Sequence, residues 1–342
     1  MMSDRAWNEM LDEFRALGGT ADNICLKDGP FGRGLFPLDP GKPVRIHIPE
    51  TLLIDTSEVS VENGALRVSP QSQAGERERA FLERYENEFS WGAGGRADVE
   101  RFFAEVQALP EPVRRLLSGK LGVPQWLEAV TPERVLARFL GARAYGYHGR
   151  TVVMPIIELA NHGSEASYRD TGGISLEGGF AGEVLVCYSN SDAFQIFLTW
   201  GFATEMPLAL SVGGKMNTRS GRTVTIKREF EGGRAGAGSD TLWIPEVTSE
   251  GSDTTLSYLM IGNKQFPRLP KGIFYKLMRE AGFANVEETF DTIQHMNRMY
   301  FLDVIGAVEG HEGHEGPMVR TLRDMARFQL QAMSHCYGVR EI

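Results

Sequence analysis

Hydrophobic positions along the chain follow helical spacing in some segments and strand alternation in others. Residues 4–17 carry apolar side chains three and four positions apart, which predicts a short amphipathic helix that buries Trp7, Met10, Leu11 and Phe14. After Gly18-Gly19 the pattern changes, because Val44, Ile46 and Ile48 alternate with polar residues as a half-buried strand does. The N-terminal part therefore predicts one helix followed by a β-rich stretch.

The middle of the chain, from about residue 60 to residue 145, has a helical pattern. Phe81, Tyr85 and Phe89 recur four apart among charged residues, which predicts an amphipathic helix over residues 76–91. At Thr131-Pro132 the threonine suits a helix cap and the proline suits the first helical turn, so we expect another helix to begin there.

The rest of the chain returns to strands and ends in helices. The expected elements are strands at 152–155, 174–176 and 184–186, a short helix at 190–199, alternating segments between 223 and 260, and helices at about 271–281, 285–305 and 318–336. This order predicts an α+β protein.

Composition narrows the class of protein. The 342 residues hold 36 Lys+Arg against 45 Asp+Glu, a formal net charge of −9, which argues against a nucleic-acid partner. No stretch approaches the roughly 18 consecutive apolar residues of a membrane span. The chain's first residues lack the apolar segment of a signal peptide, and three widely spaced cysteines form no disulfide framework. We expect a cytoplasmic protein with no membrane partner.

Several motifs that form binding or catalytic sites in other proteins are incomplete in this sequence. Gly32-Arg33-Gly34 is followed by a strand where a dinucleotide-binding loop requires a helix. The glycine-rich residues 232–238 lack the Lys-Ser/Thr of a phosphate-binding loop. The His-Glu run at 310–316 offers metal ligands, but its glycines favour a solvated loop, so we expect no metal site there. No Ser-His-Asp or Cys-His pattern of a hydrolase stands out.

The most informative segment is residues 152–202. An Asn161-His162 pair follows an apolar strand, Gly182-Glu183 precedes a strand that ends in Tyr188, and Trp200-Gly201-Phe202 closes a short helix. Together with GRGLF at 32–36 and VRIHIPETLLI at 44–54, this ordered set resembles the SET-domain methyltransferases. The subfamily it resembles is that of Rubisco large-subunit methyltransferase and its relatives, lysine and actin-histidine methyltransferases with a helical insertion.

The resemblance implies a SET β-clip core formed by two segments, residues 20–57 and 138–212, with a helical insertion at 58–137 between them. It implies that residues 213–342 form a mainly helical C-terminal domain, which in this subfamily engages a substrate protein. It further implies S-adenosyl-L-methionine as cofactor and N-methylation of an acceptor amine as the reaction, which requires no metal.

Carried over position by position, the resemblance assigns site residues. Tyr188 matches the family's catalytic tyrosine, and Trp200 and Phe202 match the aromatic walls of its acceptor channel. The positions that match its cofactor-binding residues are Gly32, Arg33, Gly34, Leu35, Arg143, Glu158, Asn161 and His162. A structural arginine at 143 and a satisfied core network at 161 and 162 are the alternatives.

The chain departs from the family pattern mainly where the acceptor would bind. Ser189 follows Tyr188 in place of glycine, Trp200 replaces a tyrosine, and Asp192 replaces an asparagine. We expect a lysine of a protein as acceptor. Protein histidine, a small-molecule amine, and a cofactor-binding or scaffold protein without transfer activity are the alternatives.

Overall fold

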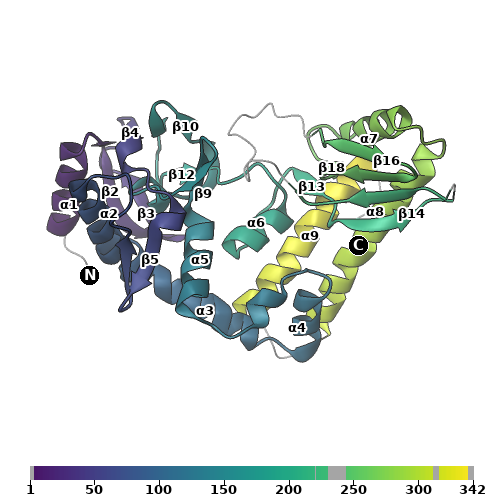
Figure 1. Cartoon of the computed structure of the whole chain (residues 1–342), viewed down its shortest axis with the longest axis horizontal. Coiled ribbons are helices and arrows are strands. Elements are labelled where there is room, and N and C mark those ends of the chain that lie inside the picture. Colours follow the sequence, from purple (N-terminus) through teal and green to yellow (C-terminus); the bar gives the residue numbers. More distant parts are fainter. Residues whose placement is uncertain (1–3, 220, 230–243, 311–315, 338–342) are drawn as a thin grey trace. The chain divides into compact units, whose positions relative to one another are not determined.

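The computed structural model describes residues 4–219, 221–229, 244–310 and 316–337, with side chains in the last helix described as far as residue 334. The chain divides into two compact units: unit 1 is Met1–Arg101 with Ala129–Tyr188, and unit 2 is Phe102–Glu128 with Ser189–Ile342. The segment 58–137, expected as one helical insertion, is thus shared between the two units. The prediction of a protein that mixes helices and strands is confirmed (Figure 1).

Unit 1 contains a four-stranded antiparallel sheet in the order β1-β4-β11-β10, formed by Thr20–Asp22, Val44–Pro49, Gly173–Gly178 and Arg169–Asp170. Around it lie three antiparallel hairpins, β2-β3 (Ile24–Gly29, Gly32–Pro37), β5-β6 (Val59–Glu62, Ala65–Val68) and β7-β8 (Tyr145–Tyr147, Arg150–Val152). The pair β9-β12 (Asn161–Ala166, Leu185–Val186) is parallel.

The helices of unit 1 form where the hydrophobic spacing predicts them. Helix α1 (Asp4–Ala16) buries the four predicted apolar residues, and α2 (Glu76–Phe89) stacks its aromatic rings in a row from Phe81 through Tyr85 to Phe89. Helix α5 (Pro132–Arg143) is capped by the Thr131 hydroxyl, which accepts a hydrogen bond from the Arg134 N–H. Helix α3 (Arg96–Gln107) runs from unit 1 into unit 2.

One predicted strand is shorter than expected. Strand β8 ends at Val152, and residues 153–160 contain a tight turn and the short 3₁₀ helix η5 (Ile157–Leu159) instead of continuing the strand. The apolar run Val152–Ile157 is buried throughout, and a continuous buried run cannot be assigned to a strand by periodicity alone.

Unit 2 joins two small sheets to a group of helices. Strands β13 (Leu208–Leu210) and β18 (Met260–Asn263) pair antiparallel. A second sheet has the order β14-β15-β17-β16, with Gly214–Asn217, Thr223–Ile226, Asp253–Leu256 and Val247–Glu250. The helices are α4 (Glu111–Ser118), α6 (Ala193–Trp200), α7 (Leu269–Glu280), α8 (Val286–Glu309) and α9 (Pro317–Tyr337).

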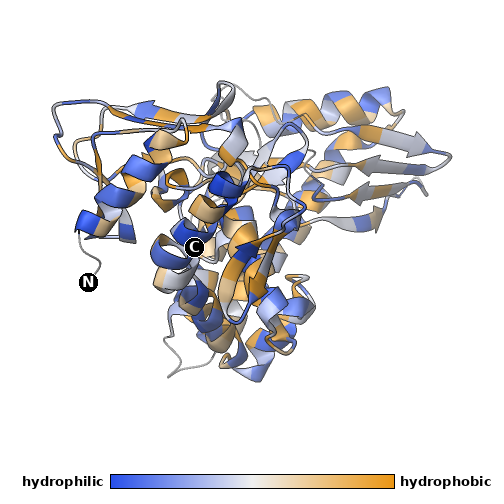
Figure 2. Ribbon diagram, turned by 60° about the vertical axis from the view of Figure 1, so that its left-hand side comes forward, coloured by the Kyte–Doolittle hydropathy of each residue, from blue (hydrophilic) through white to orange (hydrophobic). Residues whose placement is uncertain are grey.

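The long helices α8 and α9 lie side by side, and their apolar residues join one large core (Figure 1). In Figure 2 the helices and strands carry hydrophobic positions next to hydrophilic ones, as amphipathic elements do. Strand β18 approaches α9 so closely that a Cβ on Gly262 would lie 2.7 Å from the Ala332 carbonyl oxygen. This backbone contact leaves room for glycine only.

A buried ion pair stabilises the start of the second segment of unit 2, which begins at Ser189. The Asp192 carboxylate is fully buried, accepts hydrogen bonds from the Gln195 and Leu210 N–H groups, and caps α6. The Arg228 guanidinium donates to both of its oxygens, at 2.9 and 3.3 Å. One carboxylate therefore ties together α6, β13 and the chain after β15.

We expect Asp192→Ala to lower the free energy of unfolding by about 3–5 kcal/mol, because it leaves the Arg228 charge without its buried partner. Urea denaturation of the full chain measures this. The control is Asp303→Ala, which removes an exposed ion pair with Lys120 and should cost about 0–1 kcal/mol. Equal losses in the two variants would contradict the structural role of Asp192.

Candidate functional site

Three segments that are far apart in the sequence meet in unit 1. Strand β3 contains the Gly32–Leu35 motif, β9 begins at Asn161, and the chain from Glu183 leads through β12 to Tyr188. The Val184 N–H donates to the Leu35 carbonyl at 2.7 Å, and β12 pairs in parallel with β9, Leu185 opposite Asn161. Most of the predicted cofactor-binding residues are thereby close in space.

Gly34 is required by the space that its neighbours occupy. A Cβ at this buried position would lie 2.2 Å from the Glu183 Oε1 atom and 2.7 Å from the Asn161 Nδ2 atom. At the nearby Gly29 of β2, a Cβ would lie 2.6 Å from the Phe36 ring and 2.9 Å from the Glu183 Oε2 atom. The two glycines of the hairpin thus leave room for one carboxylate.

The Asn161 amide connects strand β3, called here the glycine strand, to the Glu183 carboxylate. Its Nδ2 group donates to Glu183 Oε1 at 2.5 Å and, more weakly, to the Arg33 carbonyl at 3.4 Å. Because both partners are acceptors, the amide nitrogen must face them and the amide oxygen must face away.

The Glu183 carboxylate itself is buried to about nine-tenths. Within the described residues its Oε2 atom has no hydrogen-bond partner. A buried acceptor without a partner costs free energy in the isolated protein, which is typical of a group that meets a ligand.

A strained turn precedes Asn161. Ile156 has φ 68° and ψ −59°, a left-handed conformation that a β-branched residue adopts rarely, and the Ile157 N–H donates to the Pro155 carbonyl at 2.8 Å. This is the geometry of a γ-turn with positive φ, which costs about 1–3 kcal/mol. Such strain concentrates at functional sites, where the surrounding contacts hold it in place.

The contacts that hold this turn centre on the buried Glu158. Its Oε1 atom accepts a hydrogen bond from the Tyr85 hydroxyl at 2.9 Å, and the Arg143 Nε atom lies 3.4 Å from its Oε2 atom. The Arg143 guanidinium also covers the Phe139 ring at 4.4 Å. Helices α2 and α5 are thus both anchored to the turn.

A second carboxyl is buried beside Glu158. Glu86 of α2 is fully buried, and neither of its oxygens has a hydrogen-bond partner in the described part of the chain. Burial raises the pKa of the Glu86 carboxyl well above its ordinary value, and the Glu158 charge raises it further, whereas Arg143 acts in the opposite direction. Burial also raises the pKa of Glu158, and again Arg143 opposes the shift.

His162 and Tyr188 form the other end of the site. The Tyr188 N–H donates to the His162 Nδ1 atom at 3.3 Å, and the two ring centroids are 5.2 Å apart. Burial lowers the pKa of His162, so the neutral imidazole is favoured and its proton lies on Nε2. The half-buried Tyr188 hydroxyl donates its hydrogen to the Ala160 carbonyl at 2.8 Å.

The other predicted residues have structural contacts of their own. The Arg33 guanidinium donates to the Phe89 carbonyl at 2.5 Å, Gly32 turns the β2-β3 hairpin with φ +94°, and Leu35 is fully buried. Trp200 and Phe202 belong to unit 2, where they pack on a cluster formed by Ala193, Ile196 and Met206. Their role as walls of an acceptor channel stays a prediction.

Sequence reasoning missed Glu183, Tyr85 and Glu86 as members of the site. The Gly182-Glu183 pair was part of the motif, but its spacing does not reveal that the carboxylate fills the space beside Gly34. In α2, Tyr85 looks like a core residue and Glu86 like one more charge of a solvated face. Only the packing of α2 against Glu158 distinguishes them.

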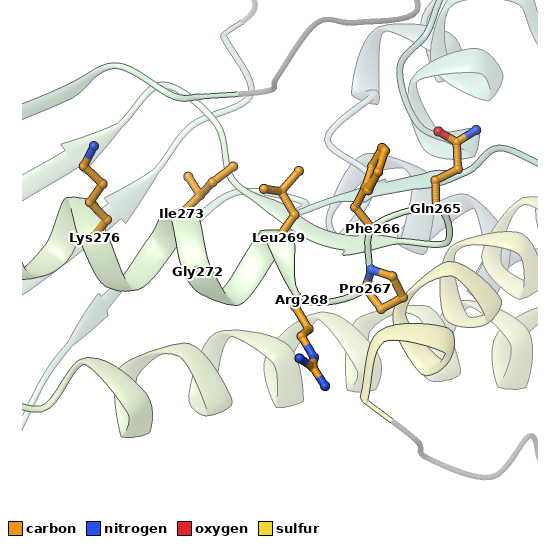
Figure 3. A pocket seen from close by; sticks show the side chains of 8 residues that line it. All are labelled: Gln265, Phe266, Pro267, Arg268, Leu269, Gly272, Ile273 and Lys276. Carbon is orange, nitrogen blue, oxygen red and sulfur yellow. The ribbon is translucent and has the colours of Figure 1, made fainter.

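A further surface hollow is lined mainly by apolar side chains. Figure 3 shows this hollow in unit 2, where Phe266, Leu269 and Ile273 project from the same side of α7 and the preceding turn.

No group of three His, Cys, Asp or Glu side chains suited to a metal occurs in the described ranges, and residues 311–315 of the His-Glu run lie outside them. None of the described helices has the length and apolar composition to cross a bilayer.

Comparison with known proteins gives a distant likeness to solved structures. No protein-family model and no curated protein matches the sequence. Among solved structures, the chain is similar to the crystal structure of the SET domain of LSMT bound to lysine and AdoHcy, with 15% sequence identity and a TM-score of 0.45. The match covers 98% of this chain and 91% of that one.

The buried Glu86 predicts a pH dependence of stability. An unfolded glutamate releases its proton near pH 4.5, whereas folded Glu86 keeps it to higher pH, so unfolding becomes easier as pH rises through this window. We expect Glu86→Gln to lose less stability than the wild type as the pH rises above the ordinary glutamate pKa of 4.5. Urea denaturation as a function of pH measures the difference.

Glu88→Gln is the matched control, because Glu88 is an exposed residue of the same helix. Its stability should follow the wild-type pH profile. A Glu86→Gln profile parallel to that of the wild type would contradict a protonated Glu86 in the folded protein.

Proposed function

We propose that this protein is an S-adenosyl-L-methionine-dependent N-methyltransferase of the SET type that acts on a lysine of a protein. The ordered sequence motifs suggest it, and one observation supports it most. The glycine strand, the Asn161-His162 pair and the chain that ends in Tyr188 meet around Gly34, although about 130 residues separate the first from the second in sequence.

The residues around Gly34 fit the amino-acid end of this cofactor. The absence of a side chain at Gly34 lets the Glu183 carboxylate and the Asn161 amide lie against the backbone of β3. Glu183 Oε2 is a buried acceptor without a partner among the described residues, and it suits a cationic donor. In this proposal Gly34, Asn161 and Glu183 hold the cofactor, with Arg33 contributing its backbone carbonyl.

When bound, S-adenosyl-L-methionine supplies a methyl group on a sulfonium sulfur, which an amine can accept by in-line displacement. The chain's own task is to align the amine and to exclude water. A lysine has a reference pKa of about 10.4 and must lose its proton first, and a partly buried site favours its neutral form.

Tyr188 orients the acceptor in this proposal. Its hydroxyl hydrogen is committed to the Ala160 carbonyl, so toward a substrate the phenol oxygen acts as an acceptor. A neutral lysine amine keeps two N–H donors while its lone pair attacks, and one of them can bond to this oxygen. The attacking nitrogen of a histidine carries no hydrogen, so this geometry favours an amine over an imidazole.

The proposal is tested by incubating the purified protein with a substrate-containing lysate and cofactor labelled in the transferred methyl group. We expect label in a protein band, and in a methyl-lysine after hydrolysis of that band. Label in methyl-histidine or only in small molecules would indicate the alternative acceptors. Cofactor binding without any transfer would indicate a non-catalytic protein.

We expect Tyr188→Phe to lower turnover by roughly 10²-fold or more, the scale of a lost transition-state hydrogen bond, while cofactor affinity stays near that of the wild type. Tyr258→Phe is a control, because that hydroxyl bonds to a carbonyl in unit 2. Initial rates and calorimetry with S-adenosylhomocysteine measure the two quantities. A folded Tyr188→Phe variant with unchanged turnover would make Tyr188 a structural residue.

A further inference from the structure

Two side chains that lie next to the Gly34 backbone each have an acceptor atom without a donor in the described parts of the chain. One is Glu183 Oε2, on a carboxylate buried to about nine-tenths. The other is the Asn161 amide oxygen, which faces away from Glu183 because Nδ2 donates to Oε1 and to the Arg33 carbonyl. The two side chains are hydrogen-bonded to each other at 2.5 Å, so these acceptors are held as one group.

No cation of the described residues forms an ion pair with this carboxylate. The Arg143 guanidinium pairs with Glu158, and the Arg33 guanidinium donates to the Phe89 carbonyl. The Lys27 ammonium of the same hairpin is exposed and lies over the Phe36 ring. A buried carboxylate that has only an amide for a partner is strongly unfavourable unless a cation joins it.

A primary ammonium group meets this requirement. It carries a positive charge and three donors and has no acceptor, so it can bond to a carboxylate and an amide oxygen together. A metal ion would find a single carboxylate here, because the described residues contain no group of three His, Cys, Asp or Glu side chains that could hold one. The lack of a side chain at Gly34 leaves room for the Glu183 carboxylate and the Asn161 amide to lie together beside β3.

We infer that Glu183 is a binding residue that receives the α-ammonium group of the cofactor's amino-acid end, together with Asn161. This inference rests on the proposed function, and it assigns a role to a residue that the sequence motifs leave without one. It agrees with the absence of a side chain at Gly34, since a side chain at that position would displace the carboxylate. Tyr188, whose hydroxyl donates a hydrogen bond to the Ala160 carbonyl, then orients the acceptor.

The test compares two ligands by titration calorimetry with the full chain: S-adenosylhomocysteine and its analogue without the α-amino group. Glu183→Gln keeps the shape of the side chain and an oxygen for Asn161 but removes the charge. We expect it to weaken binding of S-adenosylhomocysteine by about tenfold to a hundredfold, as for a lost hydrogen bond to a charged group. Its affinity for the deaminated analogue should equal that of the wild type.

Glu165→Gln is the matched control, because Glu165 is an exposed carboxylate on β9 and its loss changes the net charge equally. It should bind both ligands as the wild type does. If Glu183→Gln fails to fold, Glu183→Asp replaces it, since the shorter chain withdraws the carboxylate and the same selective loss is expected.

Three results would overturn the inference. Unchanged affinity of Glu183→Gln for S-adenosylhomocysteine would do so while leaving the proposed function intact. An equal loss for both ligands would make Glu183 a support of the fold and not a partner of the ammonium group. Absence of binding of either ligand to the wild type would overturn both this inference and the proposed function.

Discussion

The space beside Gly34 is the constraint on which the arrangement of unit 1 depends. The Glu183 carboxylate and the Asn161 amide fill it, at distances that exclude even a methyl group. Because these two side chains also bond to each other, strand β3, the start of β9 and the chain before β12 must adopt their positions together. The parallel pairing of β9 with β12 and the hydrogen bond from Val184 to Leu35 follow from the same packing. A glycine chosen for space, and not for a positive φ, thus connects three segments of the sequence.

Buried charge and backbone strain both lower the stability of this arrangement. Glu86, Glu158 and Glu183 are all buried, yet Arg143 is the cation placed against the first two. The turn at Ile156 adds a backbone conformation that a β-branched side chain disfavours. Three buried carboxyls and a strained turn in one unit are difficult to explain as devices for stability, because apolar residues would pack there more favourably. They are expected where a site must present polar groups in a fixed geometry.

The elements were easier to predict from the sequence than the site. The spacing of Phe81, Tyr85 and Phe89 and the Thr131-Pro132 start identify two helices correctly, because periodicity and capping are local properties. The strand expected at 152–155 was wrong beyond Val152, since a buried apolar run is compatible with a strand, a turn or a 3₁₀ helix. Glu86 and Glu183 could not be identified, because their environment is created by contacts between residues that are distant in sequence. A resemblance of ordered motifs can indicate which segments meet, but not which carboxylate fills the space between them.

The three residues Ala160–His162 link the two ends of the candidate site. The Ala160 carbonyl accepts the Tyr188 hydroxyl, the Asn161 amide holds Glu183 beside the glycine strand, and the His162 ring accepts the Tyr188 N–H. The group proposed to hold the cofactor and the group proposed to orient the acceptor are therefore fixed by consecutive residues of one short segment. Any shift of this segment moves both groups together, which preserves the distance between donor and acceptor that in-line transfer requires. The anchors of the segment, Tyr85 and Arg143 on Glu158, lie on helices α2 and α5. Tyr85 belongs to the segment 58–137 that sequence analysis regards as an insertion, whereas Arg143 belongs to the second core segment. In this structure the insertion therefore supplies one of the two anchors of the site.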